Sequence, residues 1–353
     1  MSELPERAAR RLGVDPSMKT LGNLIRQLID IPSVTGSEAE LAGFVEKTLE
    51  DRGFQVTRQE VQADRYNVYA RSDGRPKVVL CTHLDTVPPF YGSSEDERYI
   101  YGRGACDAKG CLAAMLEAAT RLRGEGANGL GLLFVVGEEV DSIGAKIANR
   151  LQPGSQYVLV GEPTESRMAS GHKGTFGFVL RARGRAAHSA YPHLGDSAIE
   201  RLLGTLERIR QADWGQSQLL GPATVNVGTL SGGLAANVIA PEARADVLVR
   251  VVGKASEAEA KLRGIIGDDR NLEYQVVSQN DAVRCETLPG FEVAPMAFGT
   301  DIPALTELGR PLLFGPGSIH DAHTAQEKIE KQEALRAVDL YHQAAGDLLR
   351  RAS

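Results

Sequence analysis

The chain has 353 residues, of which 42% are apolar and 24% charged. Because a single hydrophobic core stops growing at about 250 to 300 residues, this length favours two domains. A formal net charge of −6 without a basic stripe argues against a nucleic-acid partner. No apolar run approaches the roughly 20 residues that span a bilayer, and the charged N-terminal stretch lacks the apolar centre of a secretory signal, so we expect a cytoplasmic protein without a membrane partner.

The first half of the chain alternates segments of helical and strand-like periodicity. Apolar residues recur at helical spacing in four segments, and short apolar runs typical of buried strands lie among them. Such alternation predicts a sheet that is at least partly parallel and covered by helices on both faces. We expect helices at 21–33, 38–53, 109–126 and 143–151, and strands at 65–72, 77–85, 129–139 and 156–163.

The pattern changes near Gly174 and returns to the earlier one near Cys285. The segment between them combines strand-like runs with two helical patterns, which indicates an α+β module of about a hundred residues. One domain is therefore expected to be inserted into another. We expect its strands at 174–190, 223–233, 236–252 and 272–281, and its helices at 197–212 and 256–268.

Polar side chains follow several of the apolar strands. In open α/β sheets, ligands bind outside the carboxyl ends of the strands, and five separate segments deliver acidic or imidazole side chains to that edge. Each residue alone has an ordinary explanation, such as a helix cap or a solvated surface group. Together, unpaired carboxylates on one rim would repel each other unless metal ions lay among them. These residues are His83, Asp85, Asp107, Glu138, Glu139, Glu162, His320 and His323.

A charge count indicates how many metal ions this set could hold. Three carboxylates and two neutral imidazoles around two divalent ions leave one positive charge, which a bridging hydroxide cancels. His83 and Asp85 lie two residues apart on one side of an extended chain, an arrangement that suits an imidazole ligand with a carboxylate behind it. The set therefore predicts two metal ions.

Five sequence segments resemble, in order and spacing, the motifs of the dinuclear zinc amidohydrolases, a family that includes acetylornithine deacetylase, succinyl-diaminopimelate desuccinylase, aminoacylase and carboxypeptidase G. These segments are THLDTVP, YGRGACDAKG, GEEVDSIGA, GEPT and GPGSIHDAHTAQE. The resemblance runs from about Leu21 to the C-terminus. It implies an α/β catalytic domain (1–173 and 285–353) with a mixed, largely parallel sheet, interrupted by an α+β lid domain (174–284) that forms a homodimer interface.

The resemblance also implies a ligand for each position around the metals. Asp107 would bridge both ions, His83 and Glu162 would complete one site, and Glu139 and His323 would complete the other. The ions would be zinc, or else cobalt or manganese, which histidine and carboxylate ligands also suit.

The same motifs imply the catalytic groups. Glu138 would be the general base that takes a proton from the water between the metals, and Asp85 would orient His83. His188, in the lid segment RAAHSAYPH, would stabilise the oxyanion, often from the neighbouring subunit; His193 lies in the same stretch but matches the motif less well. His320 is a rival of His323, but the spacing of AHTAQE favours His323 with Glu327.

Three further residues are expected to contact the substrate. Arg250 has a guanidinium fork that suits an α-carboxylate, although a strand arginine that faces water is the alternative. Asn237 follows a glycine pair and could hydrogen-bond a ligand, and Thr300 is expected at the pocket.

The expected reaction is attack of zinc-activated hydroxide on the amide of an N-acyl amino acid. The motifs favour acetylornithine deacetylase-like members, acting on acetylornithine, acyl-lysine, acyl-citrulline or succinyl-diaminopimelate in arginine or lysine biosynthesis. A cytosolic dipeptidase or tripeptidase that acts on short peptides with the same metal centre is the alternative.

Two interpretations from other classes are weaker. A non-catalytic binding protein with this fold would be expected to lack the base or a ligand, and all are present. A cysteine hydrolase based on Cys106 would keep its activity in a chelator, which the metal hypothesis forbids. The four cysteines form no C-x-x-C pair, and the N-terminal stretch 1–17 has no counterpart in the motifs, so we expect only a short extension there.

Overall fold

The computed structural model describes residues 16–352, which divide into two compact units. The larger unit contains the described residues up to Ser170, Cys285–Ala294 and the chain from Thr300 onward. The smaller unit contains Gly171–Arg284 and Pro295–Gly299. Most of the predicted N-terminal extension lies outside the described residues.

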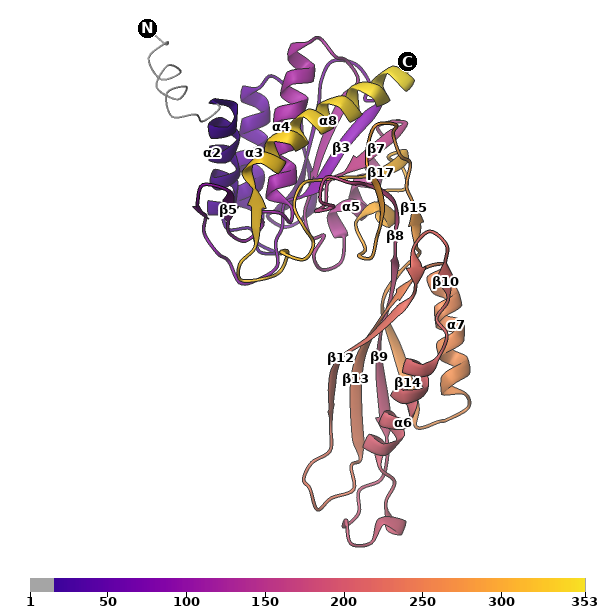
Figure 1. The fold of residues 1–353 in the computed structure, drawn as a ribbon. Helices are drawn as coiled ribbons and strands as arrows, with labels where there is room; N and C mark the ends of the chain where they lie inside the picture. The colour runs from indigo at the N-terminus through magenta and orange to yellow at the C-terminus, as the bar shows by residue number, and fades with distance from the viewer. Residues whose placement is uncertain (1–15, 353) are drawn as a thin grey trace. The chain divides into compact units, whose positions relative to one another are not determined.

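A six-stranded mixed sheet forms the centre of the larger unit (Figure 1). Its strand order is β1-β2-β6-β3-β7-β17. The strands β6, β3, β7 and β17 are parallel to one another, whereas β2 pairs antiparallel with both β1 and β6. The predicted mixed, largely parallel sheet is therefore confirmed. The strands are β1 (Gln55–Gln62), β2 (Arg65–Arg71), β3 (Val78–His83), β6 (Leu130–Val135), β7 (Tyr157–Val160) and β17 (Arg310–Leu313).

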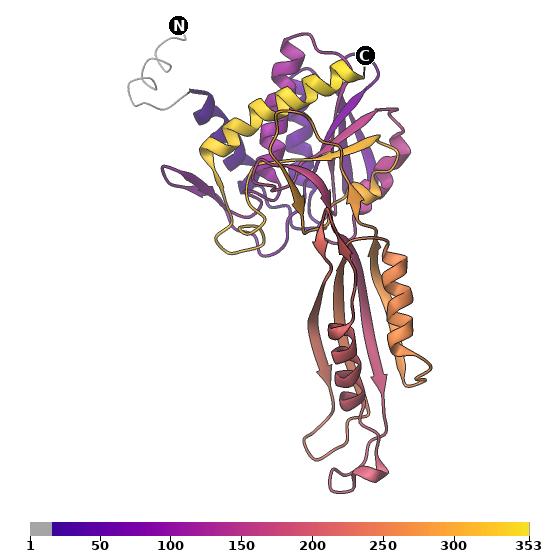
Figure 2. The same cartoon turned by 45° about the vertical axis from the view of Figure 1, so that its right-hand side comes forward.

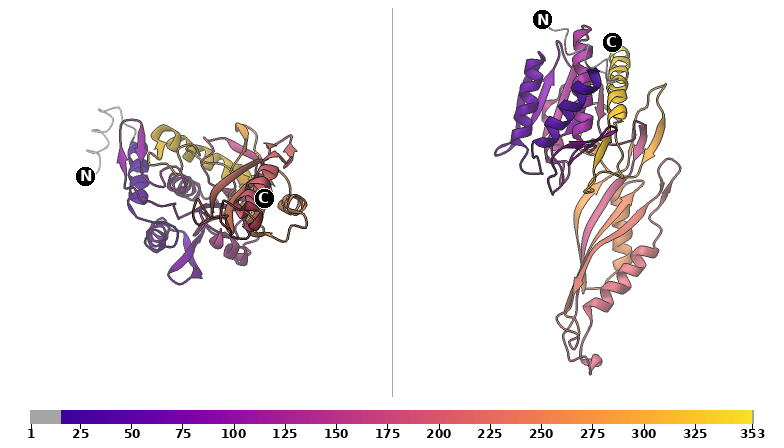
Figure 3. Two further views of the ribbon diagram at one scale, coloured as in Figure 1. Left: turned by 90° about the horizontal axis from the view of Figure 1, so that it is seen from below. Right: turned by 60° about the vertical axis from the view of Figure 1, so that its left-hand side comes forward.

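Helices cover this sheet. The chain passes from β3 to β6 in one direction along the sheet and from β6 to β7 in the other, so right-handed crossovers place α4 and α5 on opposite faces. On one face α2, α4 and α8 pack against one another (Figure 3, right). The helices are α2 (Pro16–Asp30), α3 (Ala39–Asp51), α4 (Lys109–Gly124), α5 (Ile143–Ala148) and α8 (Lys331–Arg351), with short 3-10 turns at Asn149–Leu151 and Ile302–Ala304.

The sequence did not predict β1. Its residues, QVTRQEVQ, contain only two apolar side chains, and most of the strand is exposed at the edge of the sheet. Pairing with β2 holds it in place, and a non-local ladder of this kind leaves no apolar pattern in the sequence. Two small sheets were missed for the same reason: β4 (Ser94–Glu95), β5 (Tyr99–Tyr101) and β18 (Lys328–Glu330) form one, and β8 (Met168–His172), β15 (Val283–Arg284) and β16 (Val293–Met296) form the other.

The smaller unit is an antiparallel sheet of order β12-β13-β9-β14 with α6 and α7 packed on it (Figures 1 and 2). Burial alternates along β13: Ala245, Val247 and Val249 face the helices, whereas Arg250 belongs to the opposite face. Ser197 caps α6 by accepting a hydrogen bond from the Glu200 amide at 3.3 Å. The elements are β9 (Gly174–Arg183), β12 (Thr224–Gly232), β13 (Glu242–Val251), β14 (Leu272–Asn280), α6 (Ala198–Gln211) and α7 (Ala255–Ile266), with a 3-10 turn at Pro192–Leu194 and a short hairpin of β10 (Gln216–Ser217) and β11 (Gly221–Pro222).

None of the described helices combines the length and the apolar character needed to cross a membrane.

The C-terminal helix α8 is fixed to the end of the parallel sheet by one buried tyrosine. Tyr341 is fully buried, and its hydroxyl donates to the carbonyl of Phe314 at 2.7 Å, directly after β17. The next residue must be glycine, because a Cβ at Gly315 would lie 2.5 Å from the carbonyl oxygen of Glu162. The chain after β17 is thereby held close against the chain after β7.

We expect Tyr341→Phe to lower the free energy of unfolding by about 1 to 3 kcal/mol, because the buried Phe314 carbonyl loses its donor. Urea denaturation would measure the loss. The control is Tyr101→Phe, which removes a 2.8 Å bond to the exposed carboxylate of Asp96 and should lower the free energy of unfolding by clearly less. Equal losses in the two variants would contradict the role given to Tyr341.

Candidate metal centre

The acidic and imidazole side chains gather beyond the carboxyl ends of the parallel strands. His83 is the last residue of β3 and lies opposite Val135, the last residue of β6, while Val160 ends β7. Because these strands are parallel and end at the same edge of the sheet, the residues that follow them reach that edge. Glu138 and Glu139 follow β6, Glu162 follows β7, His323 lies in the loop after β17, and Asp107 precedes α4.

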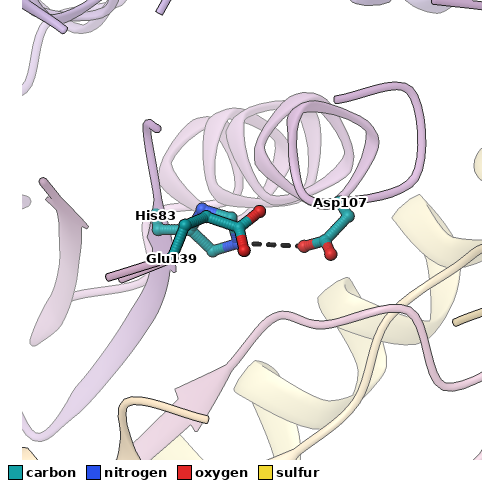
Figure 4. A group of neighbouring side chains, drawn as sticks. All are labelled: His83, Asp107 and Glu139. Atoms are coloured by element: carbon teal, nitrogen blue, oxygen red, sulfur yellow. Dashed lines mark hydrogen bonds and ion pairs between the residues drawn. The ribbon is translucent and has the colours of Figure 1, made fainter. Parts of the chain in front are cut away.

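Asp107 lies between two imidazoles. Its Oδ1 is 3.0 Å from Nε2 of His83, and its Oδ2 is 3.2 Å from Nε2 of His323. Figure 4 shows the side chains of His83, Asp107 and Glu139 gathered together. Asp107 is not the cap of α4, since the N-cap residue is Ala108 and no side chain caps that helix. Its two oxygens instead face two different partners.

Each imidazole is also close to a second carboxylate. Nε2 of His83 lies 3.9 Å from Oε2 of Glu162, and Nε2 of His323 lies 3.1 Å from Oε2 of Glu139. Metal–ligand bonds of about 2.0 to 2.2 Å at tetrahedral angles place neighbouring ligand atoms about 3.3 to 3.6 Å apart. The observed separations are close to this value on both sides of Asp107. His83, Asp107 and Glu139 alone already place three donor atoms within 4.8 Å of one another.

Without metal, protons must hold this cluster together. Hydrogen bonds to Asp107 and Glu139 raise the pKa of His323 to about 10. Burial alone would lower the pKa of His83, but its bonds to Asp107 and Asp85 raise it well above its usual range. Burial would raise the pKa of Asp107, yet the bonds from His323 and His83 outweigh it and lower that pKa.

The remaining carboxylates are poorly compensated. Burial, together with the charges of their acidic neighbours, raises the pKa values of Glu138 and Glu162 well above their usual range. Oε1 of Glu162 is buried and has no hydrogen-bond partner among the described residues. Divalent cations would supply the missing positive charge and a partner for this oxygen. The donor set of imidazole and carboxylate therefore fits bound metal, and zinc, cobalt and manganese all suit it.

Asp85 holds the backbone that presents the two glutamates. Its carboxylate accepts from the amides of Glu138 at 3.0 Å and Glu139 at 3.1 Å, and from the hydroxyl of Thr35 at 2.8 Å. Nδ1 of His83 bonds to the backbone carbonyl of Asp85 at 2.9 Å, whereas the carboxylate lies 3.5 Å away. Asp85 thus fixes both the imidazole of His83 and the chain that carries Glu138 and Glu139.

His323 reaches the cluster from a strained backbone. Its φ of 62° lies in the left-handed region, which costs a non-glycine residue of order 1 to 3 kcal/mol and is concentrated at functional sites. Its side chain is half exposed, unlike that of His83, which is buried. His320 is exposed, and its backbone amide donates to the hydroxyl of Ser318.

Sequence reasoning assigned a role to Thr300, which was expected at the pocket, but none to Thr35 or Asp301, which lie near the cluster. Thr300 is buried, and its hydroxyl accepts from the amide of Ile302 at 3.2 Å. Asp301 is 2% exposed, and burial raises its pKa to about 6. Thr35 and Asp301 belong to no motif discussed above, so no pattern in the sequence would have identified them.

In the smaller unit, the structure brings His188 and Asn237 together. The amide of Ser189 donates to the carbonyl of Asn237 at 3.0 Å, and the backbones of His188 and Val238 form an isolated antiparallel β-bridge. The imidazole of His188 is exposed, and its Nδ1 accepts from the amide of Ala190 at 3.1 Å. In the neutral ring this bond leaves the proton on Nε2.

Arg250 lies in a cationic region of the same unit. Burial, and then the charge of Arg250, lower the pKa values of both His172 and Lys173. The ammonium of Lys173 donates to the carbonyl of Pro222 at 2.6 Å. This grouping of basic side chains suits an anionic ligand.

Comparison with known proteins gives concordant matches in sequence and fold. The model of peptidase family M20/M25/M40 matches residues 79–347. The chain is 39% identical over 337 residues to a peptidase M20 domain-containing protein of Schizosaccharomyces pombe, covering 92% of this chain and 84% of that protein. It is 39% identical over 360 residues to a probable carboxypeptidase of Aspergillus clavatus, covering 90% and 80%.

The fold is similar to that of a tripeptidase from Staphylococcus aureus, with a TM-score of 0.81 at 20% identity, covering 94% of this chain and 99% of that chain. The predicted fold class, an α/β domain interrupted by an inserted α+β domain, is confirmed.

We expect metal binding to release protons at pH 7.5. With a pKa of about 10, the metal-free His323 carries a proton at this pH, and a metal ion must displace it. Metal affinity should therefore rise with pH up to about pH 10. Protonated His323 also stabilises the metal-free fold, and this stabilisation is lost as the pH rises from 6.5, the ordinary pKa of histidine, to about 10. Calorimetric titration of zinc in buffers of different ionisation enthalpy should show at least one proton released per chain, and fewer for His323→Asn. Proton-neutral binding would contradict the electrostatic description of the cluster.

Proposed function

Because the chain belongs to peptidase family M20/M25/M40, we propose that it is a metal-dependent hydrolase that cleaves the amide bond between an acyl group and a C-terminal amino acid. The observation that carries this proposal is the position of Asp107, whose two oxygens face two separate imidazole–carboxylate pairs. On this basis we assign two divalent ions, zinc first: one to His83, Asp107 and Glu162, the other to Asp107, Glu139 and His323.

When bound, the two ions would supply Lewis acidity and lower the pKa of a water molecule between them. We assign Glu138 as the general base for that water. Burial and the charges of neighbouring acids raise the pKa of Glu138, which makes its carboxylate a stronger base. The carboxylate would accept a proton from the water and then deliver it to the departing amine. Asp85 supports this role because it fixes the amide of Glu138.

His188 is assigned to the oxyanion of the tetrahedral intermediate. Oxyanion stabilisation requires a donor N–H, and the bond from the Ala190 amide to Nδ1 leaves that donor on the exposed Nε2. The family resemblance assigns His188 this role across a homodimer, and both the dimer and the lid function of the smaller unit stay predictions. Asn237 and Thr300 likewise stay predicted substrate contacts.

Arg250 is assigned to the α-carboxylate of the substrate. A guanidinium fork binds a carboxylate through two charge-assisted hydrogen bonds, and a carboxylate would offset the repulsion between Arg250 and Lys173. A free α-carboxylate is common to the C-terminal residue of a peptide and to an N-acyl amino acid. The chemistry of the two substrates therefore differs only in the acyl group.

The comparisons favour a substrate in which the acyl group is the remainder of a peptide chain, since the A. clavatus relative is named a probable carboxypeptidase. N-acetyl or N-succinyl amino acids, which the sequence motifs favour, are the second possibility at the same bond. A dipeptidase or tripeptidase is the third, supported by the fold of the S. aureus tripeptidase.

A substrate panel with a base variant tests the proposal. N-blocked dipeptides, N-acetyl and N-succinyl amino acids, free dipeptides and the C-terminal amide of each would be incubated with the zinc-loaded protein. We expect cleavage of free-carboxylate substrates with a blocked amine and little cleavage of the amides. Glu138→Gln should lower kcat by about 10²- to 10⁴-fold while the bound metal is retained.

The matched control is Glu97→Gln, an exposed glutamate, which should leave kcat unchanged. Cleavage that requires a free amine would move the assignment to a dipeptidase. Equal turnover of the amidated substrates would remove the carboxylate role of Arg250, and full activity in Glu138→Gln would remove the assigned base.

A further inference from the structure

Arg103 and Glu327 form a buried ion pair directly behind Asp107. Nη1 of Arg103 lies 2.6 Å from Oε2 of Glu327, and the two side chains are 2% and 1% exposed. The residues are 224 positions apart in the sequence. A buried ion pair loses about as much through desolvation as it gains through attraction, so stability alone does not explain it.

The other oxygen of Glu327 holds the backbone of the bridging aspartate. Oε1 accepts from the amide of Asp107 at 3.1 Å and from the amide of Cys106 at 3.2 Å. The carboxylate is therefore divided: one oxygen binds the guanidinium and the other binds the chain that carries Asp107. Buried backbone amides require such a partner, because an unsatisfied N–H is costly away from water.

The local sequence explains how Arg103 reaches this position. Gly102 and Gly104 flank it with φ values of 141° and 86°, which side chains rarely tolerate, and a Cβ at Gly102 would lie 2.5 Å from Ile29. The amide of Arg103 donates to the carbonyl of Tyr91 at 3.0 Å, and its Nε donates to that of Pro89 at 3.3 Å. The guanidinium is thus held in one orientation before it meets Glu327.

Glu327 also connects Asp107 to the loop of His323. The amide of Gly102 donates to the backbone carbonyl of Glu327 at 3.0 Å, and β18 pairs with β5 immediately beyond, with Lys328 opposite Tyr101. His323 lies four residues before Glu327 in the same loop. One carboxylate therefore ties together the two chain segments that present Asp107 and His323.

We propose that Arg103 and Glu327 are positioning residues for the metal centre: Arg103 holds the Glu327 carboxylate, and Glu327 fixes the backbone of Asp107 so that its two oxygens are aimed at two ions. Neither residue is assigned to the substrate or to a metal. The inference rests on the proposed metal site. Loss of a residue that hydrogen-bonds a metal ligand typically lowers metal affinity by about 10- to 100-fold.

Two double variants separate positioning from stability. R103M/E327Q and R103M/E327M both remove the ion pair, and their side chains at position 327 are similar in size. The glutamine keeps an oxygen that can accept from the Asp107 amide, whereas the methionine has none. The glutamine buries an amide NH2 without a partner, whereas the methionine leaves the amides of Cys106 and Asp107 unpaired, so the two variants should be of similar stability.

The measurements are the zinc affinity of each folded variant, by competition with a chromophoric chelator, and its thermal unfolding without metal. We expect R103M/E327M to bind at least one of the two ions about 10- to 100-fold more weakly than R103M/E327Q, although the two variants unfold at similar temperatures. Equal affinities, or a weaker affinity of R103M/E327M that comes together with a lower unfolding temperature, would overturn the proposal.

Two further proteins keep the test decisive. Glu117→Gln breaks another 2.6 Å ion pair, to Arg52 between α3 and α4, and should leave zinc affinity unchanged. If the double variants do not fold, Glu327→Gln alone should lose about 10- to 100-fold in affinity, because its oxygen turns to Arg103 and leaves the Asp107 amide unpaired. Wild-type affinity in that variant would overturn the inference, and a wild-type protein that binds no zinc would overturn the proposed function with it.

Discussion

Mutual repulsion among carboxylates at the ends of the parallel strands is the constraint on which the site depends. Asp107, Glu139 and Glu162 converge where β3, β6 and β7 end, and the two imidazoles are the charge partners that the structure shows for them. The raised pKa of Glu162 and its unpartnered oxygen are consequences of that crowding. A cluster built in this way is stable with cations and strained without them.

The two supporting carboxylates bind the backbone that carries the ligands. Asp85 binds the amides of Glu138 and Glu139, and Glu327 binds those of Cys106 and Asp107. Both supporting carboxylates are buried, so each lies behind the chain it holds and away from solvent. The geometry of the centre is therefore fixed by the fold before any metal arrives, which is the arrangement that preorganised catalysis requires.

Much of the fold and the site could be predicted because the signals are local. Strands of continuous apolar residues predicted the parallel part of the sheet, and His83, Glu139 and Glu162 could be placed because each lies at or shortly after the carboxyl end of such a strand. What escaped prediction depends on contacts between distant segments. The polar strand β1 exists through its pairing with β2, and Arg103 meets Glu327 only after folding, so neither leaves a periodic pattern. Thr35 supports Asp85 from 50 positions away and belongs to no motif.

The central claim is that Asp107 joins two metal sites in one chain. The most direct measurement is the number of zinc ions retained per chain after gel filtration, by elemental analysis, in the wild type and in Glu162→Ala and Asp107→Ala. We expect two ions in the wild type, one in Glu162→Ala, and fewer in Asp107→Ala than in Glu162→Ala, because Asp107 faces both imidazoles. A single ion in the wild type, or two ions retained in Asp107→Ala, would contradict this claim.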